Sequence, residues 1–139
     1  MNASDVCIAT ASALVAGDRG LLTMDESNPA CNKRFAKLGI PQTEHARHAW
    51  RELILTTPCL GECISGVILY ETIRQQKKDG TSFVKLITDA GIIWGIKVDT
   101  GAKDMPGHPG EKITEGLDDC ANVWLSMSNR GLVLPSGVR

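Results

Sequence analysis

Three runs of apolar residues divide the chain, and each has the length of a single β-strand. They are LLTM at residues 21–24, ISGVILY at residues 64–70 and IIWGIKVD at residues 92–99. The runs are continuous and do not alternate between apolar and polar positions, which is typical of strands buried on both faces of a parallel sheet. The pattern therefore predicts three parallel strands, the last of which carries Lys97 and Asp99 near its carboxyl end.

Helical spacing of apolar residues occupies the intervals around these runs. We expect helices over approximately residues 5–16, 28–39, 43–57 and 83–91. In the second of them Asn28 is placed to cap the helix, Pro29 occupies the first helical position and Gly39 ends it. In the third, the apolar face leaves three charged residues on other faces, namely Glu44, Arg47 and Arg51.

Strands that alternate with helices indicate an α/β fold of repeated strand–helix units, although no sequence repeat accompanies them. In folds of this kind ligands bind beyond the carboxyl ends of the parallel strands. Asp25 and Ser27 follow the first predicted strand, and Lys97 lies at the end of the third. We therefore expect these three residues on the face where chemistry would take place.

Composition narrows the possible partners. With 139 residues the chain has room for one ordinary domain, and its net charge of −1 lacks the basic excess of a general nucleic-acid or membrane-surface binder. No apolar run reaches the length of about 18–20 residues that a membrane helix needs, and the N-terminus lacks the pattern of a signal or transit peptide. We expect a cytoplasmic protein.

The cysteines do not indicate a disulfide framework. There are five of them at irregular spacing, Cys7, Cys31, Cys59, Cys63 and Cys120. An odd number favours reduced thiols. A metal site is disfavoured, because Cys59 and Cys63 lack a second Cys/His pair nearby, and His45 and His48 are expected on a helix surface.

Asp25 and Lys97 each have a chemical and a structural interpretation. At the end of an apolar strand Asp25 would be partly desolvated and able to accept hydrogen bonds from a reaction centre, or it merely starts the turn. An ammonium group in an apolar strand needs an anionic partner. For Lys97 that partner is Asp25 or Asp99 in the structural interpretation, and a substrate phosphate in the chemical one.

Ser27, Lys33 and Arg34 are expected around a helix N-terminus. Free backbone N–H groups and the helix dipole attract anions there. Capping and a solvated basic face explain these three residues equally well.

Four segments, taken together, resemble class I fructose-bisphosphate aldolase, especially its bacterial and chloroplast branch. They are GLLTMDESNPACNKR, SGVILY, GIKVDTGAK and HPGEKITEGLD, and they occur in one order at about the expected intervals. The similarity covers roughly residues 10–118. Ala30 departs from it, since a hydroxyl residue is usual there, and Trp94 replaces a common proline.

The resemblance implies the N-terminal part of a (β/α)₈ barrel, with about three of the eight strands. It implies a lyase of glycolysis and gluconeogenesis that reversibly cleaves fructose 1,6-bisphosphate into glycerone phosphate and glyceraldehyde 3-phosphate. The reaction would proceed through a lysine Schiff base, with no metal and no other cofactor. Expected partners are these sugar phosphates, not nucleic acid or a membrane, and a homo-oligomer is an option for the full-length form.

The resemblance also assigns roles to single residues. Asp25 would be catalytic, beside the Schiff base. Contacts with substrate phosphate or hydroxyl groups are implied for Ser27, Arg34, Arg47 and Lys97. Asp99 would support Lys97 as its neighbour.

We interpret residues 1–118 as the N-terminal fragment of the family's barrel, whereas residues 119–139 do not follow the family pattern. The family's Schiff-base lysine belongs to the sixth strand, and its proton-transfer lysine and glutamates to strands after the third. Written in permissible codons with one base restored at codon 119, the tail encodes Phe-Ala-Lys-Trp-Arg, a motif of the family's fourth strand. We hypothesise a frameshift, with residues 119–139 out of frame and disordered.

A fragment of this kind is expected to be poorly soluble and inactive alone, because three strands of a closed sheet leave edges and apolar faces uncovered. Two alternatives stay open. The chain is a non-catalytic module that binds sugar phosphates or docks on an aldolase subunit, or a second polypeptide supplies the remaining barrel.

Overall fold

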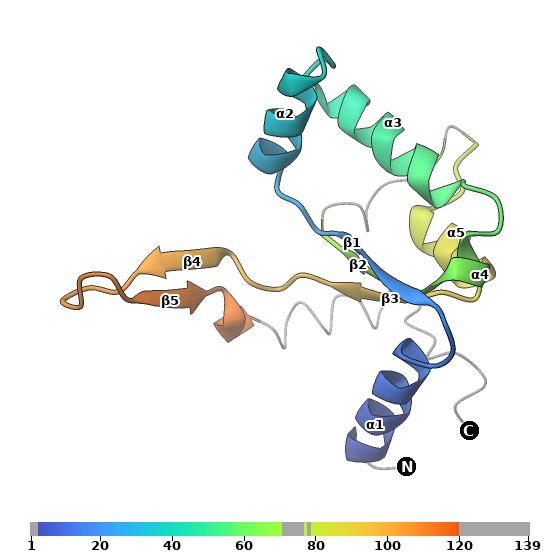
Figure 1. Cartoon of the computed structure of the whole chain (residues 1–139), viewed down its shortest axis with the longest axis horizontal. Coiled ribbons are helices and arrows are strands. Elements are labelled where there is room, and N and C mark those ends of the chain that lie inside the picture. The colour runs from blue at the N-terminus through green and yellow to red at the C-terminus, as the bar shows by residue number, and fades with distance from the viewer. Residues whose placement is uncertain (1–2, 71–76, 78, 120–139) are drawn as a thin grey trace. The chain divides into compact units, whose positions relative to one another are not determined.

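The computed structural model describes residues 3–70, 77 and 79–119, which belong to two compact units. The first unit extends to Ile96 and the second begins at Lys97. In chain order the first contains α1 (Ala3–Leu14), β1 (Gly20–Met24), α2 (Asn28–Lys37), α3 (Glu44–Leu55), α4 (Leu60–Cys63), β2 (Ile64–Leu69), α5 (Phe83–Asp89) and β3 (Ile93–Ile96). The second contains β4 (Gly101–Asp104), β5 (Lys112–Glu115) and the 3₁₀ helix η2 (Leu117–Asp119) (Figure 1). The predicted disorder of residues 119–139 falls outside the described residues, apart from Asp119.

Strands β1, β2 and β3 form a parallel sheet in that order. Leu22 lies opposite Val67, and Val67 lies opposite Trp94. The predicted parallel strands and the α/β class are confirmed. The third strand is shorter than predicted, since β3 ends at Ile96 and Lys97 lies beyond it. The Lys97 side chain is 32% exposed, so its ammonium group avoids the cost of burial in an apolar ladder.

The main core lies between the sheet and the helices α3 and α5 (Figure 1). On β2, Val67 and Leu69 are 3% and 0% exposed. They belong to one buried cluster with Met24, Leu55, Phe83, Ile87 and Ile92. Helix α1 is joined to the sheet by Ser65, whose Oγ donates a hydrogen bond to the Leu14 carbonyl at 2.6 Å. These contacts fix β1 and β2, and with them the turn that follows β1.

All four predicted helices are present, as α1, α2, α3 and α5, with ends within two residues of those expected. The predicted cap of α2 is wrong by one position. Ser27 is the N-cap, with extended backbone (φ −65°, ψ 156°), and Asn28 is already helical. Gly39 follows the C-cap with φ 67°, a left-handed conformation that glycine adopts without strain.

The second unit is built on an antiparallel hairpin. Gly101 of β4 pairs with Glu115 of β5, and Asp104 pairs with Lys112. Two ion pairs cross the ladder, Lys112 Nζ to Asp104 Oδ1 at 2.6 Å and Lys103 Nζ to Glu115 Oε2 at 3.3 Å. The apolar pattern did not predict this hairpin. In the described part of the chain, no helix is long and apolar enough to cross a membrane.

Candidate functional site

The turn between β1 and α2 holds the first group of candidate residues. Met24, the last residue of β1, is 4% exposed, and the chain then passes through Asp25, Glu26 and Ser27 before α2 begins. Asp25 is half-buried and Ser27 is exposed. The Ser27 side chain makes no hydrogen bond to the first turn of α2, although its carbonyl accepts the Cys31 N–H at 3.0 Å. The hydroxyl is therefore not used in capping the helix.

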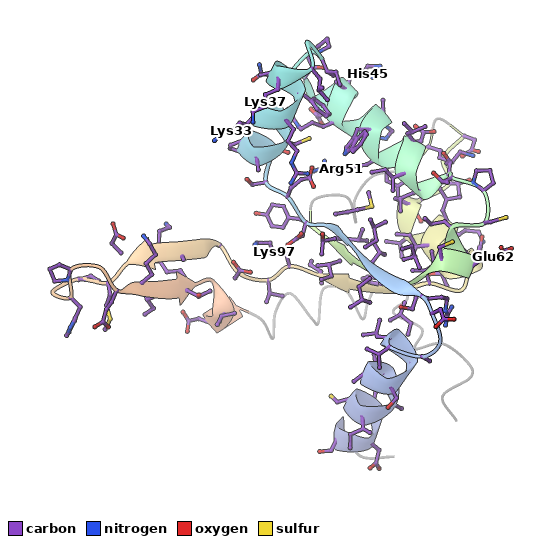
Figure 2. The ribbon with its side chains drawn as sticks, viewed as in Figure 1. Lys33, Lys37, His45, Arg51, Glu62 and Lys97 are labelled. Atoms are coloured by element: carbon purple, nitrogen blue, oxygen red, sulfur yellow. The ribbon has the colours of Figure 1, made fainter. Side chains whose placement is uncertain are left out.

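Arg34 reaches this turn from further along α2. Its Nη1 donates to Glu26 Oε1 at 3.2 Å, with the Arg34 side chain 69% exposed and that of Glu26 19% exposed. The expectation that Lys33 and Arg34 surround the N-terminus of α2 is wrong for their backbone positions, since Arg34 belongs to the last turn of that helix. Lys33 is exposed on α2 (Figure 2). The long Arg34 side chain reaches back to the turn through its contact with Glu26.

Arg47 connects α3 to α2. Its Nη1 donates to Asn32 Oδ1 at 2.9 Å and to the Gln42 carbonyl at 3.3 Å. The two helices also meet through an edge-to-face contact of Phe35 with Trp50, with ring centroids 6.4 Å apart. Arg47 thus has neutral hydrogen-bond partners, so its positive charge is not neutralised by them.

Arg51 lies one helical turn after Arg47 and is 3% exposed. The expectation that it occupies a face away from the core is wrong. Arg47, Arg51 and Leu55 recur at intervals of four, so they share a stripe of α3 that ends in the core. That spacing was the available sequence signal for a buried Arg51. Glu26, the partner of Arg34, was likewise missed, although it stands between two candidate residues.

The pKa of Cys31 depends on the charges around this residue in the first turn of α2. The thiol is 1% exposed, and burial raises its pKa above the ordinary value of 9.0. The Glu26 carboxylate raises this pKa further, while the positive charges of Arg51, Arg47 and Arg34 lower it. Four charged side chains therefore act on one point in the first turn of α2. The protonated, buried thiol is itself not suited to nucleophilic chemistry.

Lys97 and Asp99 belong to the second unit. Lys97 Nζ lies 3.4 Å from Asp99 Oδ1, so the pairing that the sequence left as one alternative is present. Asp99 Oδ1 also accepts the Gly101 N–H at 2.9 Å. These contacts fix the Asp99 carboxylate at the entry to β4, with the Lys97 ammonium group beside it.

Among residues 3–70, 77 and 79–119, no group of three His, Cys, Asp or Glu side chains could hold a metal ion. Cys7, Cys31, Cys59 and Cys63 are free thiols, and Cys120 lies outside the described residues. His45 is exposed as expected. His48 is partly buried, and its ring centroid lies 5.2 Å from that of Phe83. What the β1–α2 turn offers is a hydroxyl group, a helix N-terminus and the Arg34 guanidinium group, a combination suited to binding an oxyanion.

Comparison with known proteins points to one family. The family model of glycolytic fructose-bisphosphate aldolase class-I matches residues 7–133, and so ends within the segment 119–139. A probable fructose-bisphosphate aldolase class 1 of Xanthomonas campestris is 56% identical over 92% of this chain and 42% of its own length. The chloroplastic fructose-bisphosphate aldolase 3 of Arabidopsis thaliana is 47% identical over 86% of this chain and 31% of its own length.

A solved structure agrees with these relatives. It is the fructose-bisphosphate aldolase of Plasmodium falciparum in complex with TRAP and a small-molecule inhibitor, with a TM-score of 0.85 and 36% identity over 94% of this chain and 39% of that chain. The three-stranded parallel sheet with its helices is thus part of an aldolase barrel. The chain spans about two fifths of the length of the two Xanthomonas relatives that it matches.

Proposed function

Because the chain belongs to the class I fructose-bisphosphate aldolase family, we propose that it supplies the β1–α2 part of an aldolase active site. The reaction is the reversible cleavage of fructose 1,6-bisphosphate into glycerone phosphate and glyceraldehyde 3-phosphate, in cytoplasmic glycolysis and gluconeogenesis. The observation that carries the proposal is the β1–α2 turn, where Asp25 and Ser27 follow a parallel strand and Arg34 returns to the same turn.

The chemistry of each side chain suits such a role. The substrate ends in phosphate groups, and the unused Ser27 hydroxyl, the N–H groups of α2 and the charges of Arg34 and Arg47 would bind one of them. Asp25 is half-buried. It would accept a proton or a hydrogen bond from a hydroxyl group of the reacting carbon chain. Lys97, oriented by Asp99, would contact a second phosphate or hydroxyl group.

The reaction also needs a lysine that forms an imine with the substrate. A protonated imine withdraws electrons more strongly than a ketone, so it stabilises the carbanion left when the carbon–carbon bond breaks. We assign the imine-forming lysine to the part of the family's length that this chain does not span. The 139-residue chain alone is accordingly expected to be inactive.

A second function, docking on aldolase polypeptide without catalysis, is favoured by one observation. In the described part of the chain, β1 and β3 are the edge strands of the sheet, and Leu21 of β1 is 52% exposed. Parallel sheets are stable when both faces and edges are covered. The remaining segment of an aldolase is the natural cover.

Co-expression tests the two functions together. The chain is produced with the portion of the Xanthomonas campestris relative that follows the matched segment, and cleavage of fructose 1,6-bisphosphate is measured. We expect activity only when both polypeptides are present, and a loss of at least about 100-fold in Asp25→Asn. Borohydride should trap the substrate on the second polypeptide.

Three other results are informative. Co-purification without activity supports docking alone. Activity of the chain by itself contradicts the assignment of the imine lysine. If the two polypeptides neither associate nor cleave the substrate, the proposed function is wrong.

A further inference from the structure

Two cysteines flank a one-turn helix and take no part in the proposed active site. Helix α4 has Cys59 as its N-cap and Cys63 as its last residue, and both thiols are free and exposed. The helix leads directly into the start of β2, whereas the β1–α2 turn follows the end of the parallel strand β1. The two places therefore lie at opposite ends of the sheet.

The backbone separates the two cysteines by one helical turn. The Glu62 N–H donates to the Cys59 carbonyl at 3.0 Å, and the Ile64 N–H donates to the Leu60 carbonyl. Residues four apart on a helix are neighbours, with Cβ atoms about 5–6 Å apart. Because both thiols are exposed, rotation about χ1 can bring the sulfur atoms towards each other.

Packing holds this turn in place while leaving the thiols at the surface. A Cβ atom at Gly61 would overlap the Ala90 carbonyl oxygen, so the backbone of α4 rests directly on the end of α5. Leu60 and Ile64 pack against the hydrophobic core. The distance between the two cysteine backbones is consequently fixed, and a ligand that joins the thiols has little backbone to order.

The backbone of Cys59 is itself unusual. It has a left-handed conformation, with φ 60° and ψ 19°. Every other positive φ value among the described residues belongs to a glycine. A side chain is strained in this conformation, where glycine or asparagine is the ordinary choice. A cysteine here is unexpected for a turn with a purely structural role.

The spacing suits a bridging cation better than a disulfide bond. A disulfide needs Cβ atoms about 3.5–4.5 Å apart, which is closer than one helical turn provides. A cation bound linearly by two thiolates separates the sulfur atoms by about 4.6 Å, which is twice the length of a metal–sulfur bond. Thiolates select soft cations, of which Cu(I) is the biological example.

We propose that Cys59 and Cys63 form a two-coordinate site for a soft monovalent cation of the Cu(I) type. Each thiol loses its proton as its sulfur binds the cation. Two S–H bonds are thus replaced by two metal–sulfur bonds, two protons pass to the solvent and no atom is oxidised or reduced. The exposed carboxylate of Glu62, which lies on the same turn (Figure 2), adds negative charge that attracts the cation.

This site differs from the metal sites considered above. The lack of a second Cys/His pair near the two cysteines argues against a tetrahedral zinc site, which needs four ligands. A linear site needs only two, so it is compatible with the finding that no group of three ligands occurs among residues 3–70, 77 and 79–119. The inference does not rest on the proposed function.

Anaerobic titration of the 139-residue chain with Cu(I), in competition with a chromophoric Cu(I) chelator, tests the proposal. We expect the chain to take one Cu(I) from the chelator, and X-ray absorption to find two sulfur ligands. Cys59→Ser and Cys63→Ser should each weaken binding at least about 100-fold, because a single thiolate loses the advantage of chelation. Cys7→Ser removes another exposed thiol and is the matched control, with an expected change of less than about twofold.

Four results would overturn the inference. Equal Cu(I) affinity in the unchanged chain and in both Cys59→Ser and Cys63→Ser would exclude the site. Loss of binding in Cys7→Ser or Cys120→Ser would place the ligands elsewhere. Binding of Zn(II) as tight as that of Cu(I) would contradict the choice of a soft, two-coordinate cation. A peptide map in which air oxidation links Cys59 to Cys63 would contradict the spacing argument and make the pair a disulfide instead. Circular dichroism of each variant checks that the fold is kept.

Discussion

The positions of Asp25 and Ser27 just after β1, and of Lys97 just after β3, were predictable from the sequence because a polar residue that ends an apolar run has few positions available. Their roles as site residues stay a prediction. The run forces a strand, and the strand delivers its last residues to the carboxyl edge of the sheet. Arg51 was not predictable in the same way. Charged residues are normally placed on the solvent face of a helix, and only the stripe shared with Leu55 reveals the exception.

Cys31 gives a prediction about pH. Its pKa is raised in the folded chain, mainly by burial, so the folded state retains the thiol proton above the pH at which an unfolded thiol has lost it. The stability that this contributes is complete below the ordinary thiol pKa and is lost as the pH rises through the folded pKa. Urea unfolding midpoints measured from pH 7 to pH 10.5 should therefore fall at the alkaline end.

The matched variant is Cys31→Ala, in which the alkaline fall should be smaller even though the whole curve is lowered by the lost packing. Iodoacetamide provides a second measurement, because Cys31 should react at least about tenfold more slowly than the exposed Cys7, Cys59 and Cys63 in the same sample. Equal reaction rates at pH 7 would mean that Cys31 is not buried in solution.

At the scale of the element, hydrophobic periodicity found those helices and strands that bury an apolar face. Helix α4 has four residues, too few for a periodic pattern, and none of them is buried. The β4–β5 hairpin was missed because its residues are almost all exposed and its strands are joined by ion pairs across the ladder, not by a core. The end of β3 was predicted too late for a similar reason. The sequence does not show at which residue an apolar run leaves the sheet and becomes exposed to solvent.

Ser27 and Thr43 are the N-caps of α2 and α3. Comparing them separates the structural role of a hydroxyl group from a functional one. Thr43 Oγ1 accepts the Ala46 N–H at 3.2 Å at the start of α3, whereas the Ser27 side chain makes no such bond at the start of α2. Thr43→Ala should lower the free energy of unfolding by about 1 kcal/mol, and Ser27→Ala by less than about 0.5 kcal/mol. Chemical denaturation measures both.

A titration of the 139-residue chain with inorganic phosphate should give the opposite order of effects for the two variants. If Ser27 binds phosphate as proposed, Ser27→Ala should weaken phosphate binding several-fold, because its hydroxyl group is not used in the helix cap, while Thr43→Ala should leave the affinity unchanged. If Ser27→Ala destabilises the chain as strongly as Thr43→Ala, its hydroxyl group is a cap after all.

At the scale of the whole molecule, the family explains why the sheet has the composition of a buried one. The strands are continuous apolar runs, yet within the described residues Leu21 is 52% exposed and Leu38, the C-cap of α2, is 74% exposed. An exposed leucine on the edge strand β1 fits a sheet that continues into the further strands of a barrel. Sequence pattern alone predicts the three strands, but the closure of a barrel depends on pairings with strands far along the chain, which no local pattern records.

The reading frame at codon 119 is the prediction that decides how this barrel is completed. We expect DNA sequencing from codon 110 onwards to find one missing base at that codon, with the adjacent frame encoding the Phe-Ala-Lys-Trp-Arg motif in place of LVLPSGVR. A gene with the base restored should yield a longer product that cleaves fructose 1,6-bisphosphate without a second polypeptide. An intact codon with no aldolase frame behind it would contradict the frameshift. In that case co-expression with the rest of an aldolase is the experiment that tests whether a separate polypeptide completes the sheet at β1 and β3.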